Sequence, residues 1–389
     1  MFALPNVHIR EPIEVDGFAL VPWNDERLAT MARANRNLNS LLAAFRTEFG
    51  DQIEPPVIIW RSDMPDTYRS VTAISGFRDA IALSVVPMAW AQSLRFDRHG
   101  GAHYSDTFSV YPWMTDRNDE HLITRTPAMF GIHDVQRLRP QSIAALPIHH
   151  LEPRDIDFPM RDELLRRWQR CFATPTPDPA AERIFRSLNM ANAAAKLPAG
   201  ADANSYDTLR AVALWASAFE ILRPSRNQAY REIYELLEQV TWNYTPCKTK
   251  EYRCFGDGDG TLRALPLWLY GEITRLRNDT LHGNPIPEDR LVPEPAKRPI
   301  SLYAAPLYRI VLAAVLELKH IPGPRNPDNT DYENFRADQF EFGKYQRDIE
   351  VALETVLFTP DEFRERHTRG GRALRPAPPS TSATPDQSS

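Results

Sequence analysis

The stretch at residues 261–285, TLRALPLWLYGEITRLRNDTLHGNP, decides how the C-terminal half of this chain folds. Its apolar positions recur at helical spacing, with the threonine as the most polar member of the row: Leu262, Leu265, Leu269, Ile273, Leu276 and Thr280. Gly283 stands where a helix often ends in a left-handed residue, and two prolines follow it. The pattern predicts an amphipathic helix over residues 261–282.

Two functional side chains stand at the end of that predicted helix. At about 100° per residue, Arg277 lies at the edge of the apolar stripe and His282 on its far side, so both face solvent or a partner. The helix dipole favours a cation in the last turn. Asn278 and Asp279 precede His282 by four and three residues, a spacing that in a helix is close enough to orient its ring.

An arginine and a histidine placed together suit one kind of chemistry. Histidine transfers protons near neutral pH, and the planar guanidinium fork matches phosphate oxygens. RNA can be cleaved by its own 2′-hydroxyl when a base removes the 2′ proton and cationic donors stabilise the phosphorane. This reaction needs no metal, and it yields a 2′,3′-cyclic phosphate and a 5′-hydroxyl.

These residues resemble the motif of the HEPN ribonucleases, in particular the Apea-like HEPN branch. Arg277 fills the arginine position, Asn278 the polar position after it and His282 the histidine position, with a trailing glycine at Gly283. The upstream stretch ALWASAFEIL at 213–222 is similar to an early helix of that branch.

The resemblance implies a helical bundle and a homodimer in which two copies of the motif meet in one cleft. It implies a metal-independent endoribonuclease, used as a toxin or antiviral effector, with RNA as substrate and an antitoxin or another defence protein as a further partner. His282 would be the general acid/base, Arg277 would stabilise the phosphorane and Asn278 would position them. Some relatives are non-catalytic, so a nucleotide- or RNA-binding module or a dimerisation scaffold is the alternative.

Two acidic residues are candidates for supporting this site, Asp279 beside the motif and Glu220 on the upstream helix. Glu220 lies on an apolar helix, where it either pairs with a neighbour such as Arg223 or supports the site as a buried carboxylate. The sequence leaves both readings open.

Composition limits the other possibilities. The chain has 389 residues, 42% of them hydrophobic, and a formal net charge of −5. This acidity argues against a broad nucleic-acid-coating surface, so RNA contact should be local. No run approaches the ~18 apolar residues of a membrane span, and the N-terminus lacks the features of a signal peptide. The expectation is a cytoplasmic protein without a membrane partner.

No metal or cofactor is expected. The three cysteines, Cys171, Cys247 and Cys254, lack metal-type spacing and are interpreted as reduced thiols. The glycine- and aspartate-rich loop at 256–260 lacks the Lys-Ser/Thr ending of a phosphate loop and the carboxylate spacing of an EF-hand. The paired histidines at 99 and 103 and at 149 and 150 are interpreted as exposed loop residues.

The predicted fold class is α+β, with a mixed α/β module at residues 1–150 followed by an all-α HEPN-like bundle at 151–362. The first module is assigned a sensor or partner-recognition role. It is expected to contain a helix at 25–49, a strand at 55–60, an apolar strand or helix at 78–90, and a strand at 107–111. The second is expected to contain helices at 161–173, 181–196, 205–222, 226–243, 261–282, 300–319 and 344–358. A proline- and charge-rich stiff loop is expected at 285–299, and a disordered tail, first basic and then rich in Pro, Ser and Thr, at 363–389.

Overall fold

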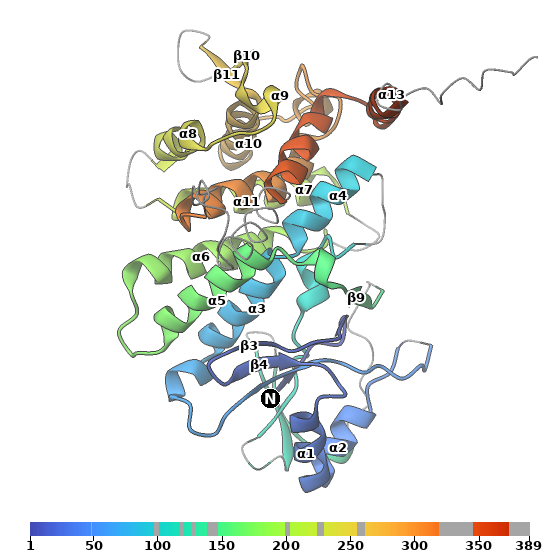
Figure 1. The fold of residues 1–389 in the computed structure, drawn as a ribbon. Coiled ribbons are helices and arrows are strands. Elements are labelled where there is room, and N and C mark those ends of the chain that lie inside the picture. Colours follow the sequence, from blue (N-terminus) through green and yellow to red (C-terminus); the bar gives the residue numbers. More distant parts are fainter. Residues whose placement is uncertain are drawn as a thin grey trace, which may run out of the picture.

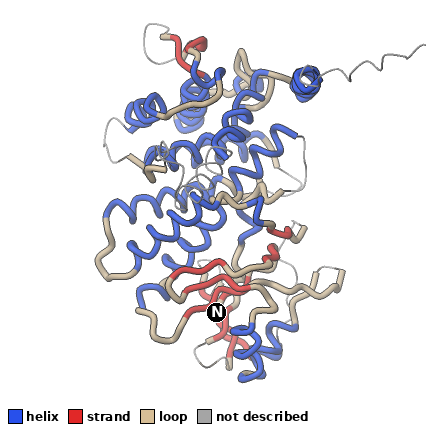
Figure 2. The backbone as a smooth tube through the Cα atoms, viewed as in Figure 1, coloured by secondary structure: helices blue, strands red, loops and turns tan. Residues whose placement is uncertain are grey.

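The computed structural model has a mixed α+β architecture, as predicted. Most strands gather around the N-terminus, and helices make up the rest of the body (Figure 2). The residues that the structure describes are 1–47, 49–96, 101–116, 118, 120–126, 129–137, 147–198, 203–223, 229–254, 261–318 and 345–372.

An antiparallel sheet of four short strands forms the N-terminal end, in the order β1-β5-β4-β3. The strands are β1 (Phe2–Ala3), β5 (Val57–Trp60), β4 (Phe18–Val21) and β3 (Ile13–Val15). Strands β3 and β4 form a hairpin closed by Asp16 and Gly17, with φ of 44° and 79°. An Asp-Gly pair with two positive φ angles is the preferred two-residue hairpin turn. The strand predicted at 55–60 is confirmed as β5.

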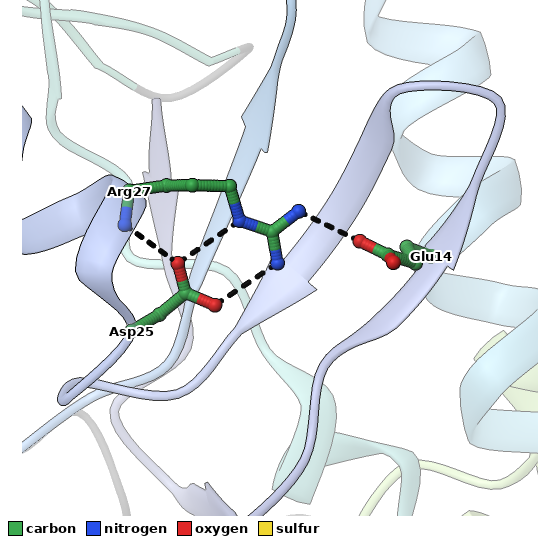
Figure 3. A network of polar contacts seen from close by, with 3 residues as sticks. All are labelled: Glu14, Asp25 and Arg27. Atoms are coloured by element: carbon green, nitrogen blue, oxygen red, sulfur yellow. Dashed lines mark hydrogen bonds and ion pairs between the residues drawn. The ribbon is translucent and has the colours of Figure 1, made fainter.

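The helix predicted at 25–49 is in fact two helices, α1 (Glu26–Ala34) and α2 (Arg36–Ala43). Asn35 divides them, because its side chain accepts hydrogen bonds from the backbone N–H groups of Asn37 and Leu38 and so caps a new helix. At the other end of α1, Arg27 donates to both carboxylate oxygens of Asp25 at 2.9 Å (Figure 3). It also reaches Glu14 of β3 at 2.7 Å, which ties α1 to the sheet.

The strand predicted at 107–111 is wrong. Residues Ser105–Phe108 form a 3-10 turn, η2, held by three contacts with distant parts of the chain. The Ser105 hydroxyl donates to the Asn192 carbonyl at 2.7 Å, Asp106 accepts from the Leu197 N–H at 2.6 Å, and the Asp106 carbonyl accepts from Asn6. Hydrogen bonds to distant residues therefore decide the conformation of this segment, although its alternation of apolar and polar residues predicts a strand.

Two further small sheets lie in the first 151 residues. Strand β2 (Val7–Ile9) pairs in parallel with β9 (His149–Leu151). Strands β6 (Met114–Thr115), β7 (His121–Arg125) and β8 (Phe130–Asp134) form an antiparallel meander. The short 3-10 helices of this region are η1 (Asp66–Arg69), η3 (Val135–Arg137) and η4 (Pro153–Asp155).

The apolar segment at 78–90 belongs to two helices, α3 (Val71–Leu83) and α4 (Val86–Phe96). Among the described residues, Val71–Phe96 is the one segment with the length and apolar composition of a membrane span. Its most apolar window is 78% buried inside the protein, which is typical of core helices.

The helical body contains most of the helices predicted from the sequence. They are α5 (Phe158–Phe172), α6 (Pro179–Ala194), α7 (Ser205–Ile221), α8 (Ala229–Gln239), α9 (Thr245–Lys248), α10 (Leu265–Leu281) and α11 (Ala304–Val315), followed by a helical stretch at 345–354. A hairpin of β10 (Lys250–Arg253) and β11 (Leu262–Ala264) precedes α10, and both lie at the end of the molecule opposite the N-terminal sheet (Figure 1). The short 3-10 helices here are η5 (Glu288–Arg290), η6 (Ile300–Tyr303) and η7 (Thr355–Leu357).

Helix α7 lies at the centre of this body and packs against α6, α10 and α11. A buried hydroxyl pins three of these helices together. Ser187 of α6 bonds to the Ala218 carbonyl of α7 and to the Tyr308 hydroxyl of α11, both at 2.6 Å.

One hydrophobic core runs across the predicted division at residue 150. Helix α3 packs on α5 and α6, and α4 packs on α11, so helices from both sides share their buried faces. The Trp168 indole donates to the Ala73 carbonyl at 2.7 Å across this contact. The division into two domains at residue 150 stays a prediction.

The C-terminal tail differs from the prediction where it is described. Pro360–Arg372 forms helix α13, so the basic part begins as a helix and not as a disordered segment. Residues 373–389 lie outside the described residues, as do the loop at 256–260 and the histidine at 99.

Candidate functional site

Helix α10 carries the motif, and local sequence explains where it begins and ends. Pro266 stands in the first turn of α10, where a backbone N–H has no partner within the helix, so proline loses no helical hydrogen bond there. The turns that follow are buried. At the other end Gly283 has φ +69°, its N–H donates to the Thr280 carbonyl, and the Asn284 N–H donates to the Asp279 carbonyl. These two bonds and the left-handed glycine are the Schellman helix end. The predicted stop at Gly283 is confirmed.

The apolar stripe is mostly confirmed. Leu265, Leu269, Ile273 and Leu276 are buried. Leu262 does not belong to the stripe, because it lies in β11 and is 48% exposed.

Arg277 is held by two neighbours on different helices. Its Nη1 donates to Asn278 Oδ1 at 2.9 Å, and its Nη2 lies 3.3 Å from Glu220 Oε2 at the end of α7. Both members of the ion pair are about a quarter exposed. Glu220 therefore pairs with the motif arginine and not with Arg223, which contacts it only through the backbone. The guanidinium is oriented across the α7–α10 interface, with its charge partly neutralised.

The imidazole of His282 is exposed at the helix C-cap. Within the described residues the ring makes no hydrogen bond, and only the backbone N–H of His282 is engaged, by the Asn278 carbonyl at 3.0 Å. The prediction that Asn278 and Asp279 orient the ring is wrong for the single chain. The Asn278 side chain binds Arg277, and Asp279 binds Arg290 at 2.7 Å and Asn284 at 3.1 Å.

Arg277 and His282 do not contact each other in the described part of the chain. Five residues of helix turn the second side chain by roughly 140° from the first. The structure thus brings Arg277, Asn278 and Glu220 together, and it leaves His282 alone at the helix end. One chain presents the parts of a site on an exposed surface without closing it.

Two carboxylates behind the motif have opposite environments. Glu272 is 3% exposed, with Arg275 and Arg290 each 4.0 Å away. Burial raises the pKa of the Glu272 carboxyl, and the two guanidiniums oppose that rise. Partial burial also acts to raise the pKa of Asp279, but hydrogen bonds from Arg290 and Asn284 outweigh it and lower that pKa. Arg290 thereby anchors the predicted loop at 285–299 to the end of α10.

A tyrosine cluster lines the inner side of α10. Tyr230 donates to the Tyr234 hydroxyl at 2.8 Å, and both rings lie against Tyr270. Burial, and next to it the Glu220 charge, raises the pKa of Tyr270 well above its usual range. A Cβ on Gly271 would overlap the Tyr234 hydroxyl, so glycine at this position lets the helices pack as they do.

The structure corrects part of the interpretation of the adjacent histidines as exposed loop residues: both lie on a strand and His149 is half-buried, whereas His150 is exposed as predicted. His149 lies on β9, 3.6 Å from Asp155, and with His103 and His150 it lines a cavity of about 910 Å³. Burial, followed by the nearby His150, lowers the pKa of His8, whose ring lies 5.0 Å from that of His150. Sequence adjacency could not reveal this, because β2 joins the histidines to residues about 140 positions earlier.

No group of three histidine, cysteine, aspartate or glutamate side chains within the described residues has the arrangement of a metal site. The three cysteines are buried and joined by no disulfide.

Comparison with known proteins identifies no relative. No protein-family model matches the chain. No curated protein and no solved structure matches it either.

Proposed function

We propose that this protein is a metal-independent endoribonuclease of the HEPN type that acts as a homodimer. The observation that carries the proposal is the end of α10. There the exposed His282 ring, which makes no hydrogen bond to the described residues, follows an Arg277 guanidinium oriented by Glu220 and Asn278. The helices α6, α7, α10 and α11 around it would form the HEPN bundle.

Geometry within one chain favours a dimeric site. RNA cleavage by 2′-hydroxyl attack uses a base close to cationic donors, and one chain keeps His282 and Arg277 apart at the end of α10. A second copy placed against the α10 end would add the second histidine and arginine. Exclusion of water between the copies would strengthen the interaction of Arg277 with the phosphorane.

RNA would then compete with Glu220 for Arg277. That ion pair is a quarter exposed, and such pairs are worth about 1 kcal/mol or less, so a dianionic transition state can displace the carboxylate. His282 would exchange protons with the 2′-hydroxyl and the leaving oxygen, and Asn278 would hold the guanidinium in plane.

A non-catalytic nucleotide- or RNA-binding module, or a dimerisation scaffold, is the second candidate. Two observations favour it. Asn278 and Glu220 already bind the Arg277 guanidinium, and Arg277 and His282 do not contact each other in the described part of the chain. It predicts nucleotide affinity or dimer formation without strand cleavage.

The deciding experiment incubates purified protein with total RNA in EDTA and analyses the fragment ends. Wild type should produce 2′,3′-cyclic phosphate ends, and His282→Ala should lower the rate by about 10²–10⁴-fold without changing the circular dichroism spectrum. The matched control is His121→Ala, an exposed histidine of β7 paired with Asp116. Equal cleavage by His282→Ala would exclude the mechanism.

A toxin or antiviral role, an antitoxin partner and a cytoplasmic location are part of the proposal. They predict that wild-type expression arrests bacterial growth and that His282→Ala expression does not. Growth arrest by both variants would contradict an RNA-cleaving toxin.

A further inference from the structure

A small pocket lies where helices α4, α6 and α7 meet, and none of the motif residues lines it. Its volume is about 130 Å³. An apolar cavity of ~150 Å³ holds benzene, so this pocket has room for about one six-membered ring. We call it the Trp90 pocket, after the side chain of α4 that lines it.

Aromatic rings form the walls of the Trp90 pocket. The rings of Trp90 and Tyr104 lie 5.9 Å apart with their planes at 89°, and both residues are only partly buried, so a ligand can reach them. Trp215 of α7 lines the pocket as well and is 5% exposed. Two rings at right angles offer the face and the edge that a further aromatic ring prefers to contact.

Small side chains leave the space between these walls open. The pocket is lined by the methyl groups of Ala194, Ala195, Ala211 and Ala305. The segment that carries Tyr104 is fixed to the end of α6, because the Ser105 N–H donates to the Ala195 carbonyl at 2.9 Å and Asp106 accepts from the Leu197 N–H at 2.6 Å. The pocket is therefore held open by bonds between distant parts of the chain.

The charge at the pocket is positive. Among the described residues that line it, Lys196 alone is charged, and this side chain is exposed. Its ammonium makes no ion pair or hydrogen bond to the described residues, and it acts on the buried Asp79 only through space. Three aromatic rings could surround a cation, but Lys196 would repel one. An anionic group suits the pocket better.

Two hydroxyls add hydrogen-bond donors to this positive charge. Thr208 of α7 and Ser301 of η6 line the pocket and are partly exposed, and the described residues make no hydrogen bond to either hydroxyl. A carboxylate accepts hydrogen bonds from ammonium and hydroxyl groups, and such charge-assisted bonds are stronger than neutral ones. A mostly apolar pocket with a few polar groups is typical of a small-molecule site.

We infer that the Trp90 pocket binds a small aromatic carboxylate with one six-membered ring, such as benzoate. The ring would lie against Trp90 and Tyr104, and the carboxylate would accept from Lys196, with Thr208 and Ser301 as further donors. The inference does not depend on RNA cleavage. It gives the expected sensor role a location, because Trp90 and Tyr104 belong to the first 150 residues and the other lining residues to the helical body.

Calorimetric titration of the full-length protein with benzoate tests the ring and the charge separately. Benzyl alcohol has the ring without the charge, and acetate has the charge without the ring. Wild type should bind benzoate, and both other probes should bind about fivefold more weakly or worse, since each lacks one of the two contacts. The inference is overturned if wild type does not bind millimolar benzoate or if either probe binds equally well.

Lys196→Gln removes the positive charge at an exposed position. It should weaken benzoate binding about fivefold and leave the affinity for benzyl alcohol unchanged. The control Lys248→Gln removes an exposed lysine of α9 that does not line the pocket, and it should bind benzoate as wild type does. Equal benzoate affinities in the two variants would exclude the role of Lys196 and with it the carboxylate.

Ala211→Leu fills the pocket from α7. It should weaken the binding of benzoate and of benzyl alcohol about tenfold or more, because the larger side chain takes the space of the ring. The control Ala43→Leu adds the same side chain at an exposed position of α2 outside the pocket and should bind as wild type does. Unchanged benzoate binding in a folded Ala211→Leu would place the ligand elsewhere and overturn the inference.

Discussion

Arg277 uses the geometry of its guanidinium as well as its charge. It reaches Asn278 and Glu220 from separate nitrogens, which a lysine ammonium cannot reproduce in the same plane. Arg277→Lys should therefore lower RNA cleavage by about tenfold or more, with a stability loss of at most about 1 kcal/mol. Rates of cyclic-phosphate formation and urea denaturation measure the two effects.

Arg275→Lys is the matched control, because Arg275 lies on the same helix and faces Glu272 at 4.0 Å. Its cleavage rate should stay within about twofold of wild type. An unchanged cleavage rate in Arg277→Lys would show that the Arg277 guanidinium does not stabilise the phosphorane.

Glu272 and Asp279 should respond to pH in opposite directions. Burial raises the pKa of Glu272, so the stability linked to this group is present at low pH and is lost as pH rises through the raised value. The pKa of Asp279 is lowered, mainly by Arg290 against the effect of burial, so its contribution is present near neutral pH and is lost as pH falls through the lowered value.

Two substitutions test this pair. Asp279→Asn should cost about 1 kcal/mol at pH 7, where the charge-assisted bond to Arg290 exists, and less as the pH falls toward 3. The free energy of unfolding of Glu272→Gln, relative to that of wild type, should be most favourable at pH 7 and should lose this advantage at acidic pH. Denaturation from pH 3 to 8 gives both profiles, and parallel profiles for the two variants would contradict the assignment.

At the scale of elements, one buried ion pair joins α5 to α11. Arg309 Nε donates to Asp157 Oδ2 at 2.7 Å, and both side chains are 1% exposed. Asp157 also caps α5 through the Met160 N–H. Asp157→Asn keeps a capping oxygen but removes the negative charge that Asp157 places beside the buried Arg309 guanidinium, which should cost about 3 kcal/mol in urea denaturation.

Asp178→Asn is the control, since Asp178 caps α6 at an exposed position and the cap oxygen survives. It should cost less than about 0.5 kcal/mol. Equal losses in the two variants would show that the buried pair adds nothing beyond capping. A partial recovery is expected when Arg309→Met is added to Asp157→Asn.

Short-range sequence signals placed most elements correctly. The predicted end of α10 at Gly283 is confirmed because this kind of helix end depends only on neighbouring residues: a glycine in the left-handed region and the Schellman hydrogen bonds around it. The strand predicted at 107–111 failed because Ser105 and Asp106 bond to residues about 90 positions away. The prediction of a single helix at 25–49 is wrong because Asn35 caps the start of α2. Asparagine is a preferred N-cap residue, so this local effect was visible in the sequence.

At the scale of the whole molecule, the proposed cleft needs two chains. Size-exclusion chromatography with light scattering should give about twice the 44.5 kDa of one chain. Mixing inactive His282→Ala with inactive Arg277→Ala should restore measurable cleavage, because a mixed dimer holds one intact arginine and one intact histidine in the shared cleft.

The same mixture separates the two candidate functions. A dimer that regains no cleavage after subunit exchange would support the scaffold reading. A monomer with full ribonuclease activity would contradict the shared cleft but not the chemistry of His282.

The sequence by itself determined the amphipathic α10, its end at Gly283, the motif residues on it and the α+β class. Each follows from periodicity or backbone preference within a few residues. Only the tertiary structure decided that Glu220 meets Arg277 across 57 positions, that the His282 ring makes no hydrogen bond to the described residues, and that Asp79 is buried beside Arg78. Such contacts depend on which helices pack together, because burial and electrostatics act through space and not along the chain.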